Sequence, residues 1–433
     1  MNIIVVSSYF GPETSVGVLR INAFVKYWAK LGHEIDVITM PYRGELPPGI
    51  KDNERIRVFQ VSPFLIGGQQ SSDSQGYAKG ATGLKRKIVQ FQYWLKRSFL
   101  CNYLDPRVLW WPRAAYVGTR LVRKTRYQCI FSTVPSYTAH SAAAVIKAFD
   151  KKLVWVADYR DLWSGNPIFP GCAPIRFLER MHEKFVLQSA DLIISINEPL
   201  VAELRAIHGR DRFLTVPNGF DDGELEVTER IEASITKTGR EVTIVYAGSI
   251  LPGLQDPTPL FQGIKELSED GLLKQGELEI RFYGDYSALD NFPLASDQSV
   301  KGFVIRCGKV PRNEILSIQR EADFLLFLGS KPVIAGIGST TGVVSGKIFE
   351  YLISGTEVLA VRVTDDMIAA QMITQACAGD YYGNDVEKIK QRLLRAIHAG
   401  GVPKVTPNMS YLDQFKRSHQ ALAVIKEVEA LVR

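Results

Sequence analysis

Short runs of aliphatic residues alternate with longer amphipathic stretches along the first half of the chain. The short runs lack a regular alternation of apolar and polar positions, which is typical of parallel strands buried on both faces. The longer stretches repeat apolar residues every three or four positions, as helices do. The pattern predicts strands at residues 3–7, 35–39, 56–61, 129–133, 153–157, 192–196 and 213–216, and helices at 17–31, 84–99, 112–125, 136–149, 174–189 and 198–207.

The same pattern restarts after a polar stretch that has no strong period. It predicts a second set of strands at 242–247, 278–283, 304–306, 324–328 and 358–361, with helices at 258–269, 312–321, 346–353, 366–376 and 385–398. A last amphipathic helix is expected at about 410–431. Strands separated by helices indicate an α/β chain with two doubly wound parallel-sheet domains. We place the domains at 1–217 and 241–407, joined by a linker at 218–240, with the C-terminal segment 408–433 packing back on the first domain.

Size and composition agree with two soluble domains. The chain has 433 residues, of which 46% are hydrophobic and 23% charged, and this length is too great for one compact core. No stretch approaches 18 uninterrupted apolar residues, so no membrane span is predicted. The N-terminus enters a strand directly, so we expect no export, and the five scattered cysteines fit a reducing cytoplasm.

Positive charge is concentrated in one segment. Residues 84–126 contain eleven Lys and Arg residues against Asp105 alone, whereas the whole chain has a net charge of +6. Trp94, Trp110 and Trp111 lie in the same segment. Basic and aromatic side chains together predict a surface that rests on an anionic membrane leaflet. A solvated helix pair with a buried aromatic side is the alternative, and nucleic acid is disfavoured because the rest of the chain is acidic on balance.

A strand, a small-residue loop and a helix start occur together near residue 346. Ligands of open parallel sheets bind beyond the carboxyl ends of the strands, and a helix N-terminus in that position favours an anion. Ser345 and Gly346 begin this helix, Lys347 adds a positive charge, and Glu350 could accept hydrogen bonds from a ribose. Phosphate and ribose together indicate a nucleotide. The spacing matches neither a P-loop nor a dinucleotide fingerprint, and an ordinary surface helix with a Lys/Glu pair is the alternative.

Several segments, taken in order, resemble the family-4 glycosyltransferases. They are "SSYFGPETSVGVLRINAFVKYWAKLGHEIDVIT" (7–39), "VADYRDLWSGNP" (156–167), "ADLIISINEPLVAEL" (190–204), "VPNGFDD" (216–222), "IVYAGSI" (244–250) and "GKIFEYLISG" (346–355). The resemblance covers nearly the whole chain. It implies the GT-B fold, in which two Rossmann-like domains face each other. The segment at 156–167 is similar to a subgroup that acts in bacterial surface-polysaccharide assembly.

The resemblance implies transfer of a sugar from a nucleotide-diphosphate sugar, usually with retention of the anomeric configuration and without a metal or other cofactor. A UDP-sugar is the expected donor, and a lipid-linked or other glycan is the expected acceptor, bound at the inner face of the cytoplasmic membrane. On the donor side, Lys347 would offset the charge of the leaving diphosphate and Glu350 would hold the ribose. Gly17 has no Cβ, so it would let the backbone of the first domain approach the donor's phosphates or sugar closely.

Further candidate residues follow the ends of strands. Gly248 and Ser249 should lie near the phosphates, and Gly284 and Lys309 should line the base, although each glycine could instead serve a tight turn. On the acceptor side we expect Asp158 or Asp161 to bind a hydroxyl, with Arg160 nearby; the alternative is an ion pair between Arg160 and one carboxylate. His140 could touch the donor sugar or be an interior histidine. Arg20 is expected to be a surface charge, and a ligand contact is the alternative.

The chain also departs from the family pattern. The usual pair of glutamates is eight positions apart, and the earlier position here is Gly342. Thr356 and Glu357 replace an apolar–Pro turn, and no clear Arg and Lys pair follows Gly248. The transferred sugar is therefore open. A nucleotide-sugar epimerase of the same fold and a non-catalytic nucleotide-sugar binding module are the alternative functions.

Overall fold

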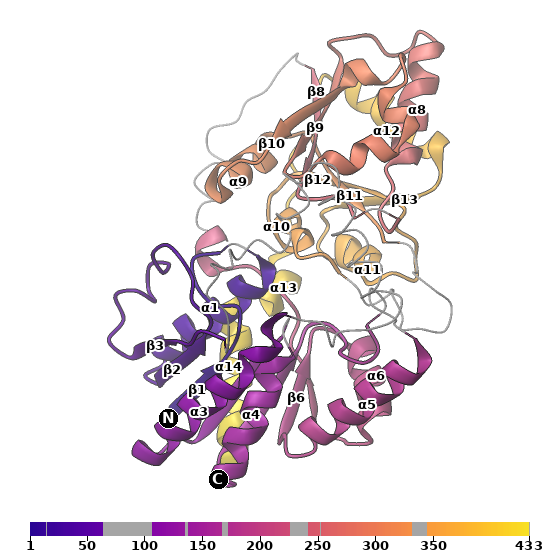
Figure 1. Ribbon diagram of the computed structural model, residues 1–433. Coiled ribbons are helices and arrows are strands. Elements are labelled where there is room, and N and C mark those ends of the chain that lie inside the picture. The colour runs from indigo at the N-terminus through magenta and orange to yellow at the C-terminus, as the bar shows by residue number, and fades with distance from the viewer. Residues whose placement is uncertain are drawn as a thin grey trace. The chain divides into compact units, whose positions relative to one another are not determined.

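A computed structural model describes residues 1–13, 15–63, 106–134, 137–166, 172–225, 241–251, 253–330 and 344–432. The helix expected at 84–99 and the position of Gly342 lie outside these residues. The described chain divides into two compact units, one formed by Met1–Asn218 with the last segment from Arg417, and one formed by the described residues between Gly219 and Lys416 (Figure 1).

The first unit is a parallel sheet of seven strands in the order β3-β2-β1-β4-β5-β6-β7. Its strands are β1 (Asn2–Val6), β2 (Glu34–Thr39), β3 (Ile56–Gln60), β4 (Cys129–Thr133), β5 (Val154–Tyr159), β6 (Leu192–Ser195) and β7 (Phe213–Thr215). Its helices are α1 (Val16–Lys30), α3 (Trp111–Lys124), α4 (Thr138–Phe149), α5 (Ala173–Leu187), α6 (Glu198–His208) and α14 (Arg417–Val432).

Helices cover both faces of this sheet. Ile3 and Val5 of β1 pack in one apolar cluster with residues of α1 and α14, while Ile4 and Val6 pack in another with residues of α3 and α4. Successive side chains of a strand point to opposite faces, so a continuous apolar run is what a doubly covered strand requires. This explains why the strands could be recognised without an alternating pattern.

The second unit is a parallel sheet of six strands in the order β10-β9-β8-β11-β12-β13. Its strands are β8 (Val242–Ala247), β9 (Leu278–Tyr283), β10 (Val304–Gly308), β11 (Phe324–Leu328), β12 (Glu357–Val361) and β13 (Gly379–Gly383). Its helices are α8 (Thr258–Glu269), α9 (Arg312–Glu321), α10 (Lys347–Leu352), α11 (Ile368–Gln375), α12 (Val386–His398) and α13 (Met409–Leu412).

Both sheets have the strand order of a doubly wound fold. The first strand of each unit, β1 or β8, is central, and the chain builds outward from it first to one side and then to the other. Ligands of such sheets bind at this reversal point, beyond the carboxyl ends of the central strands. The α/β class with two doubly wound parallel sheets, expected from the sequence, is thereby confirmed.

The C-terminal segment corrects one expectation. The sequence predicts a continuous helix at about 410–431, but α13 is followed by a 3-10 turn and an extended residue, Lys416, before α14 begins. Leu412 and Phe415 pack in the core of the second unit. Only α14 belongs to the first unit, where it contacts α1 and its Ala421 carbonyl accepts a hydrogen bond from Trp28 Nε1 at 2.9 Å.

Of the linker expected at 218–240, the structure describes residues 218–225, and those after Asn218 belong to the second unit. Phe220 is fully buried in the core of the second unit, and its backbone N–H donates to the Phe415 carbonyl at 3.1 Å. Burying an aromatic ring removes a large apolar area from water and stabilises the unit in which it is buried. The described residues after Asn218 are therefore part of the second unit rather than a free connection, and residues 226–240 lie outside the described chain.

Candidate functional site

Lys347, the first residue of α10, reaches the carboxyl end of β8. Its Nζ lies 3.8 Å from the centre of the Tyr246 ring, and a Cβ placed on Gly248 would be 3.3 Å from that nitrogen. The side chain is half-buried as a whole, but its ammonium nitrogen is shielded from solvent and has no hydrogen-bond partner within the described residues. A buried cation without an anion is costly, so this group is the site's clearest signal for an anionic ligand.

Burial sets the charge state of Lys347. Desolvation lowers its pKa from the ordinary 10.5 to about 7, and Glu350 opposes this shift. The Tyr246 ring face offers an attractive quadrupole but no acceptor. A bound diphosphate would supply the missing negative charge and return the group to its protonated form. Because α10 has only six residues, the lysine rather than a helix dipole is the principal positive element here.

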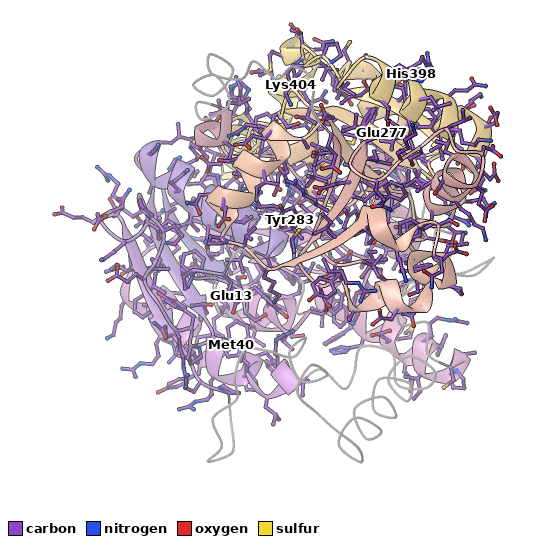
Figure 2. The ribbon with its side chains drawn as sticks, turned by 90° about the horizontal axis from the view of Figure 1, so that it is seen from above. Glu13, Met40, Glu277, Tyr283, His398 and Lys404 are labelled. Atoms are coloured by element: carbon purple, nitrogen blue, oxygen red, sulfur yellow. The ribbon has the colours of Figure 1, made fainter. Side chains whose placement is uncertain are left out.

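Glycines end the three neighbouring strands β8, β9 and β10. Gly248, Gly284 and Gly308 all have positive φ, at 114°, 108° and 78°. Gly284 follows Tyr283 (Figure 2), and a Cβ on it would lie 2.7 Å from the Gly248 carbonyl oxygen, so close packing of two backbones requires glycine there. Ser249 and Lys309, expected near the donor, are exposed at this edge.

Glu350 belongs to an ion-pair network that was not anticipated. Its Oε1 accepts from Arg312 Nη1 at 2.7 Å, and Arg312 Nη2 also binds Glu224 Oε1 at 2.8 Å. Gln319 Nε2 contacts Glu350 Oε2 at 3.4 Å. Arg312 is the first residue of α9, which follows β10, so the network lies at the same carboxyl edge. The two carboxylates hold the pKa of Arg312 above its ordinary value although burial opposes them.

Thr356, one of the departures from the family pattern, is explained by packing. Its hydroxyl is buried and accepts a hydrogen bond from Lys404 Nζ at 2.8 Å (Lys404 is labelled in Figure 2). Lys404 also donates to the Ala322 carbonyl at 2.8 Å. Glu357 pairs with Arg392. The turn after Gly355 therefore serves the fold of the second unit, not the ligand edge.

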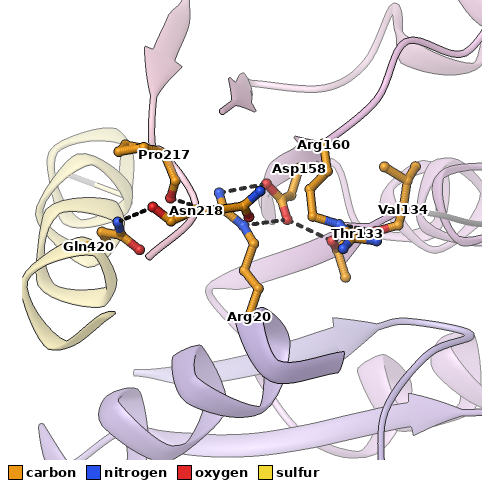
Figure 3. Close-up of polar contacts among 8 residues, drawn as sticks. All are labelled: Arg20, Thr133, Val134, Asp158, Arg160, Pro217, Asn218 and Gln420. Atoms are coloured by element: carbon orange, nitrogen blue, oxygen red, sulfur yellow. Dashed lines mark hydrogen bonds and ion pairs between the residues drawn. The ribbon is translucent and has the colours of Figure 1, made fainter. Parts of the chain in front are cut away.

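In the first unit, Arg20 and Asp158 form a buried ion pair (Figure 3). Arg20 Nη2 lies 3.0 Å from Asp158 Oδ1, its Nη1 donates to the Pro217 carbonyl at 2.6 Å, and Thr133 Oγ1 donates to Asp158 Oδ2 at 2.6 Å. The two side chains are 2% and 1% exposed. The expectation that Arg20 is a surface charge is wrong, because the partner that stabilises its burial, Asp158, lies 138 residues away.

Arg160 does not form, within the described residues, the ion pair with a carboxylate that the sequence offered as the alternative. Its Nε donates to the Val134 carbonyl at 2.8 Å, and the ion pair of Asp158 is with Arg20 instead. A Cβ on Gly17 would overlap the Arg160 guanidinium. Gly17 thus leaves room for a buried arginine of its own unit. Asp161, by contrast, is exposed.

Gly17→Ala is expected to lower the unfolding free energy by about 1–3 kcal/mol, because Arg160 must leave its position. We also expect reduced turnover if Arg160 contributes to substrate binding. Urea unfolding measures the first effect. Gly223→Ala is the matched control, since a Cβ there meets only Asp221 Oδ1 at 3.7 Å; equal stability of both variants would contradict the prediction.

His140 is an enclosed side chain. Its ring is fully buried and stacks on Tyr159 with a centroid distance of 4.9 Å, and its Nδ1 lies 2.8 Å from Ser132 Oγ. Burial lowers its pKa to about 4, so the ring is neutral at physiological pH. Its Nε2 has no hydrogen-bond partner within the described chain.

The basic aromatic segment is described only from residue 106 onward. Trp110 is fully buried in the core of the first unit, so its assignment to a membrane surface is wrong. Tyr116 is exposed on α3, together with Arg113, Arg120, Arg123 and Lys124. Residues 84–105 lie outside the described chain. Among the described helices, none is both long and apolar enough to cross a bilayer.

Comparison with known proteins finds a family match for the first unit and similar solved structures for the whole chain. Residues 18–219 match the family "Glycosyl transferase 4-like domain". No curated protein sequence matches the chain. Among solved structures, the lipopolysaccharide outer core galactosyltransferase WaaB has a TM-score of 0.57 at 11% identity, with 99% of each chain covered.

Two other similar structures are of enzymes with different activities. Sucrose-phosphate synthase from Thermosynechococcus elongatus has a TM-score of 0.54 at 14% identity, with 100% of this chain and 96% of that one covered. UDP-GlcNAc 2-epimerase from Methanocaldococcus jannaschii has a TM-score of 0.52 at 10% identity, with 99% and 100% covered. At these identities the likeness shows the fold alone. Residues 18–219 thus match a glycosyl transferase 4-like domain, and the two units of the chain have the GT-B fold.

Proposed function

We propose that the chain transfers a sugar from a nucleotide-diphosphate sugar, with a UDP-sugar as donor, to a lipid-linked or other glycan acceptor during bacterial surface-polysaccharide assembly. The reaction is retaining and metal-independent, and the enzyme works peripherally at the cytoplasmic face of a membrane. The observation that carries the proposal is the buried ammonium of Lys347 beside Gly248, which has no hydrogen-bond partner among the residues that the structure describes. The matched family supplies the reaction type.

The second unit binds the donor in this proposal. Lys347 neutralises charge that grows on the leaving diphosphate, and such a fixed positive group favours the transition state over the ground state. Gly248 and Gly284 leave the strand ends open to the phosphates of the donor. Ser249, Ser345 and Gly346 lie beside these phosphates in the proposal. Lys309 lies toward the base. Glu350, oriented by Arg312, accepts hydrogen bonds from the ribose.

The first unit binds the acceptor. Asp161 is the exposed carboxylate of the segment after β5, and we assign it the acceptor hydroxyl. Asp158 acts through Arg20 as a positioning residue, because both of its oxygens are already engaged. The Arg160 guanidinium lies against Gly17 at the start of α1. His140 stacks on Tyr159 in the core of the unit.

Thermal unfolding against UDP, GDP, ADP and dTDP tests the donor assignment. A ligand at about 100 times its dissociation constant adds roughly 2.7 kcal/mol to the unfolding free energy, and we expect the largest shift with UDP. Glu350→Ala should remove most of that shift. Glu224→Ala is the matched control, because it also takes one carboxylate from Arg312 but leaves the proposed ribose contact. If the UDP-induced thermal shift fell equally in both variants, the orientation of Arg312 and not a contact of Glu350 with the ribose would explain the loss.

An epimerase is the second candidate, since the UDP-GlcNAc 2-epimerase structure shares the fold. Incubation with a UDP-sugar and no acceptor separates the two. If the protein epimerised the UDP-sugar in this experiment, its function would be epimerisation and not sugar transfer. Binding of every nucleotide sugar without turnover, with acceptors present, would instead indicate a binding module.

A further inference from the structure

Helix α5 exposes an unusual set of apolar side chains. Phe177, Leu178, Met181 and Phe185 are 64%, 55%, 52% and 70% exposed. At 3.6 residues per turn they fall within an arc of about 100°. Elsewhere in the described chain, large exposed apolar residues occur singly or as an adjacent pair. A cluster of four on one side of a single helix therefore indicates a surface that is covered by a partner.

We propose that this surface of α5, formed by Phe177, Leu178, Met181 and Phe185 with Arg180 and Lys184, docks on an anionic membrane. The proposal concerns a surface outside the ligand edges and does not rest on the glycosyl-transfer reaction. It places the contact on a helix distinct from the basic aromatic segment at 84–126.

The charge pattern of α5 selects lipid as the partner. Arg180 and Lys184 are exposed beside the apolar stripe, whereas the two acidic residues of the helix, Glu179 and Glu183, are 1% and 0% exposed. The outward half of α5 is therefore apolar and basic without any carboxylate. Helices that lie in a membrane interface have this composition, with aromatic and aliphatic residues entering the acyl boundary and cations near the headgroups.

The inward half of α5 is fixed to the protein through Glu183. Its Oε1 accepts from the Tyr159 hydroxyl at 2.9 Å, and its Oε2 accepts from the Ser164 backbone N–H at 3.0 Å. His182 adds an edge-to-face contact with Trp163 at 5.2 Å. The helix lies beside α6 at the side of the first unit (Figure 1). These contacts hold the apolar stripe outward, and they join it directly to the segment after β5 that carries Asp161.

Flotation with vesicles tests the proposal. Wild type is expected to float with vesicles of phosphatidylglycerol and phosphatidylcholine. Phe177→Ser combined with Phe185→Ser should lower the partition coefficient at least ~10-fold, since both rings leave the interface. Phe149→Ser combined with Leu272→Ser is the matched control, because these residues are similarly exposed, at 56% and 53%, outside α5. Arg180→Glu combined with Lys184→Glu should remove the preference for phosphatidylglycerol over phosphatidylcholine alone.

The outcomes separate the possible occupants. Flotation of the Phe177/Phe185 variant equal to wild type would overturn the proposal and assign binding to residues 84–126, which are intact in every variant. Failure of wild type to float would also overturn it. If light scattering then showed a wild-type dimer and a monomeric Phe177/Phe185 variant, a second copy of the chain would be identified as the occupant. The thermal shift with UDP should persist in the α5 variants, so loss of membrane binding and loss of donor binding remain distinguishable.

Discussion

Lys347→Met is expected to lower kcat/KM for sugar transfer by about 10²–10³-fold, the effect of removing one preorganised group that stabilises developing negative charge. Thermal shifts with UDP should fall as well. The folded protein should not become less stable, because Met fills a similar volume against Tyr246 and removes a buried cation that has no anion among the described residues. Steady-state kinetics and urea unfolding measure the two effects.

The same lysine predicts a pH dependence of stability. Burial lowers its folded-state pKa to about 7, against an ordinary value of 10.5. Between these values the unfolded chain binds a proton that the folded chain lacks, so the unfolding free energy rises with pH from about 7 to about 10, by at most about 1.4 kcal/mol per pH unit from this group. The difference between wild type and Lys347→Met isolates this contribution.

Binding of the donor should reverse the pKa shift. A diphosphate next to Lys347 favours the charged form, so UDP binding at pH 8 should take up a proton, which calorimetry in buffers of different ionisation enthalpy detects. Lys347→Met should show no uptake, whereas Lys274→Met, which changes an exposed lysine, should behave as wild type. The assignment of Lys347 to the diphosphate would be refuted if Lys347→Met had the turnover of wild type and if wild type took up no proton when UDP binds.

Much of the fold could be predicted because both sheets are parallel and covered on both faces. Buried strands such as β11, Phe324–Leu328, are continuous apolar runs, and the helices between them are amphipathic. β13 was missed because Gly379-Asp380-Tyr381-Tyr382-Gly383 has the composition of a turn. Pairing with β12 at the sheet edge overrides that local preference.

The site was less predictable because its organising contacts are long-range. Lys347 and Glu350 could be proposed from their place at a helix start, but Arg312 gave no signal, since its partners lie 88 and 38 residues away. Arg20 was likewise classed as exposed, because a lone arginine in a helix usually is. The positions that serve packing, such as Thr356 with Lys404, became distinguishable from ligand positions only when their partners were known.

Arg20→Met is expected to lower the unfolding free energy by about 3–5 kcal/mol, because it leaves the buried Asp158 carboxylate with Thr133 but no cation. Asp158→Asn should cost less, since Arg20 keeps the Pro217 carbonyl. The loss of unfolding free energy in the double variant should be smaller than the sum of the losses in the two single variants, by a coupling energy of about 0.5–3 kcal/mol. Urea unfolding of the three variants and wild type gives this cycle.

Activity in the same cycle separates positioning from direct chemistry at Asp158. If Asp158 acts only by fixing Arg20 and the start of α1, the double variant removes an uncompensated charge and should recover part of the turnover that Arg20→Met loses. If the carboxylate itself contacts an acceptor hydroxyl, the double variant can be no more active than Asp158→Asn. We expect recovery, because the 1% exposed carboxylate already has both oxygens bound, whereas Asp161→Asn, at an exposed position, should lower turnover without a comparable loss of stability.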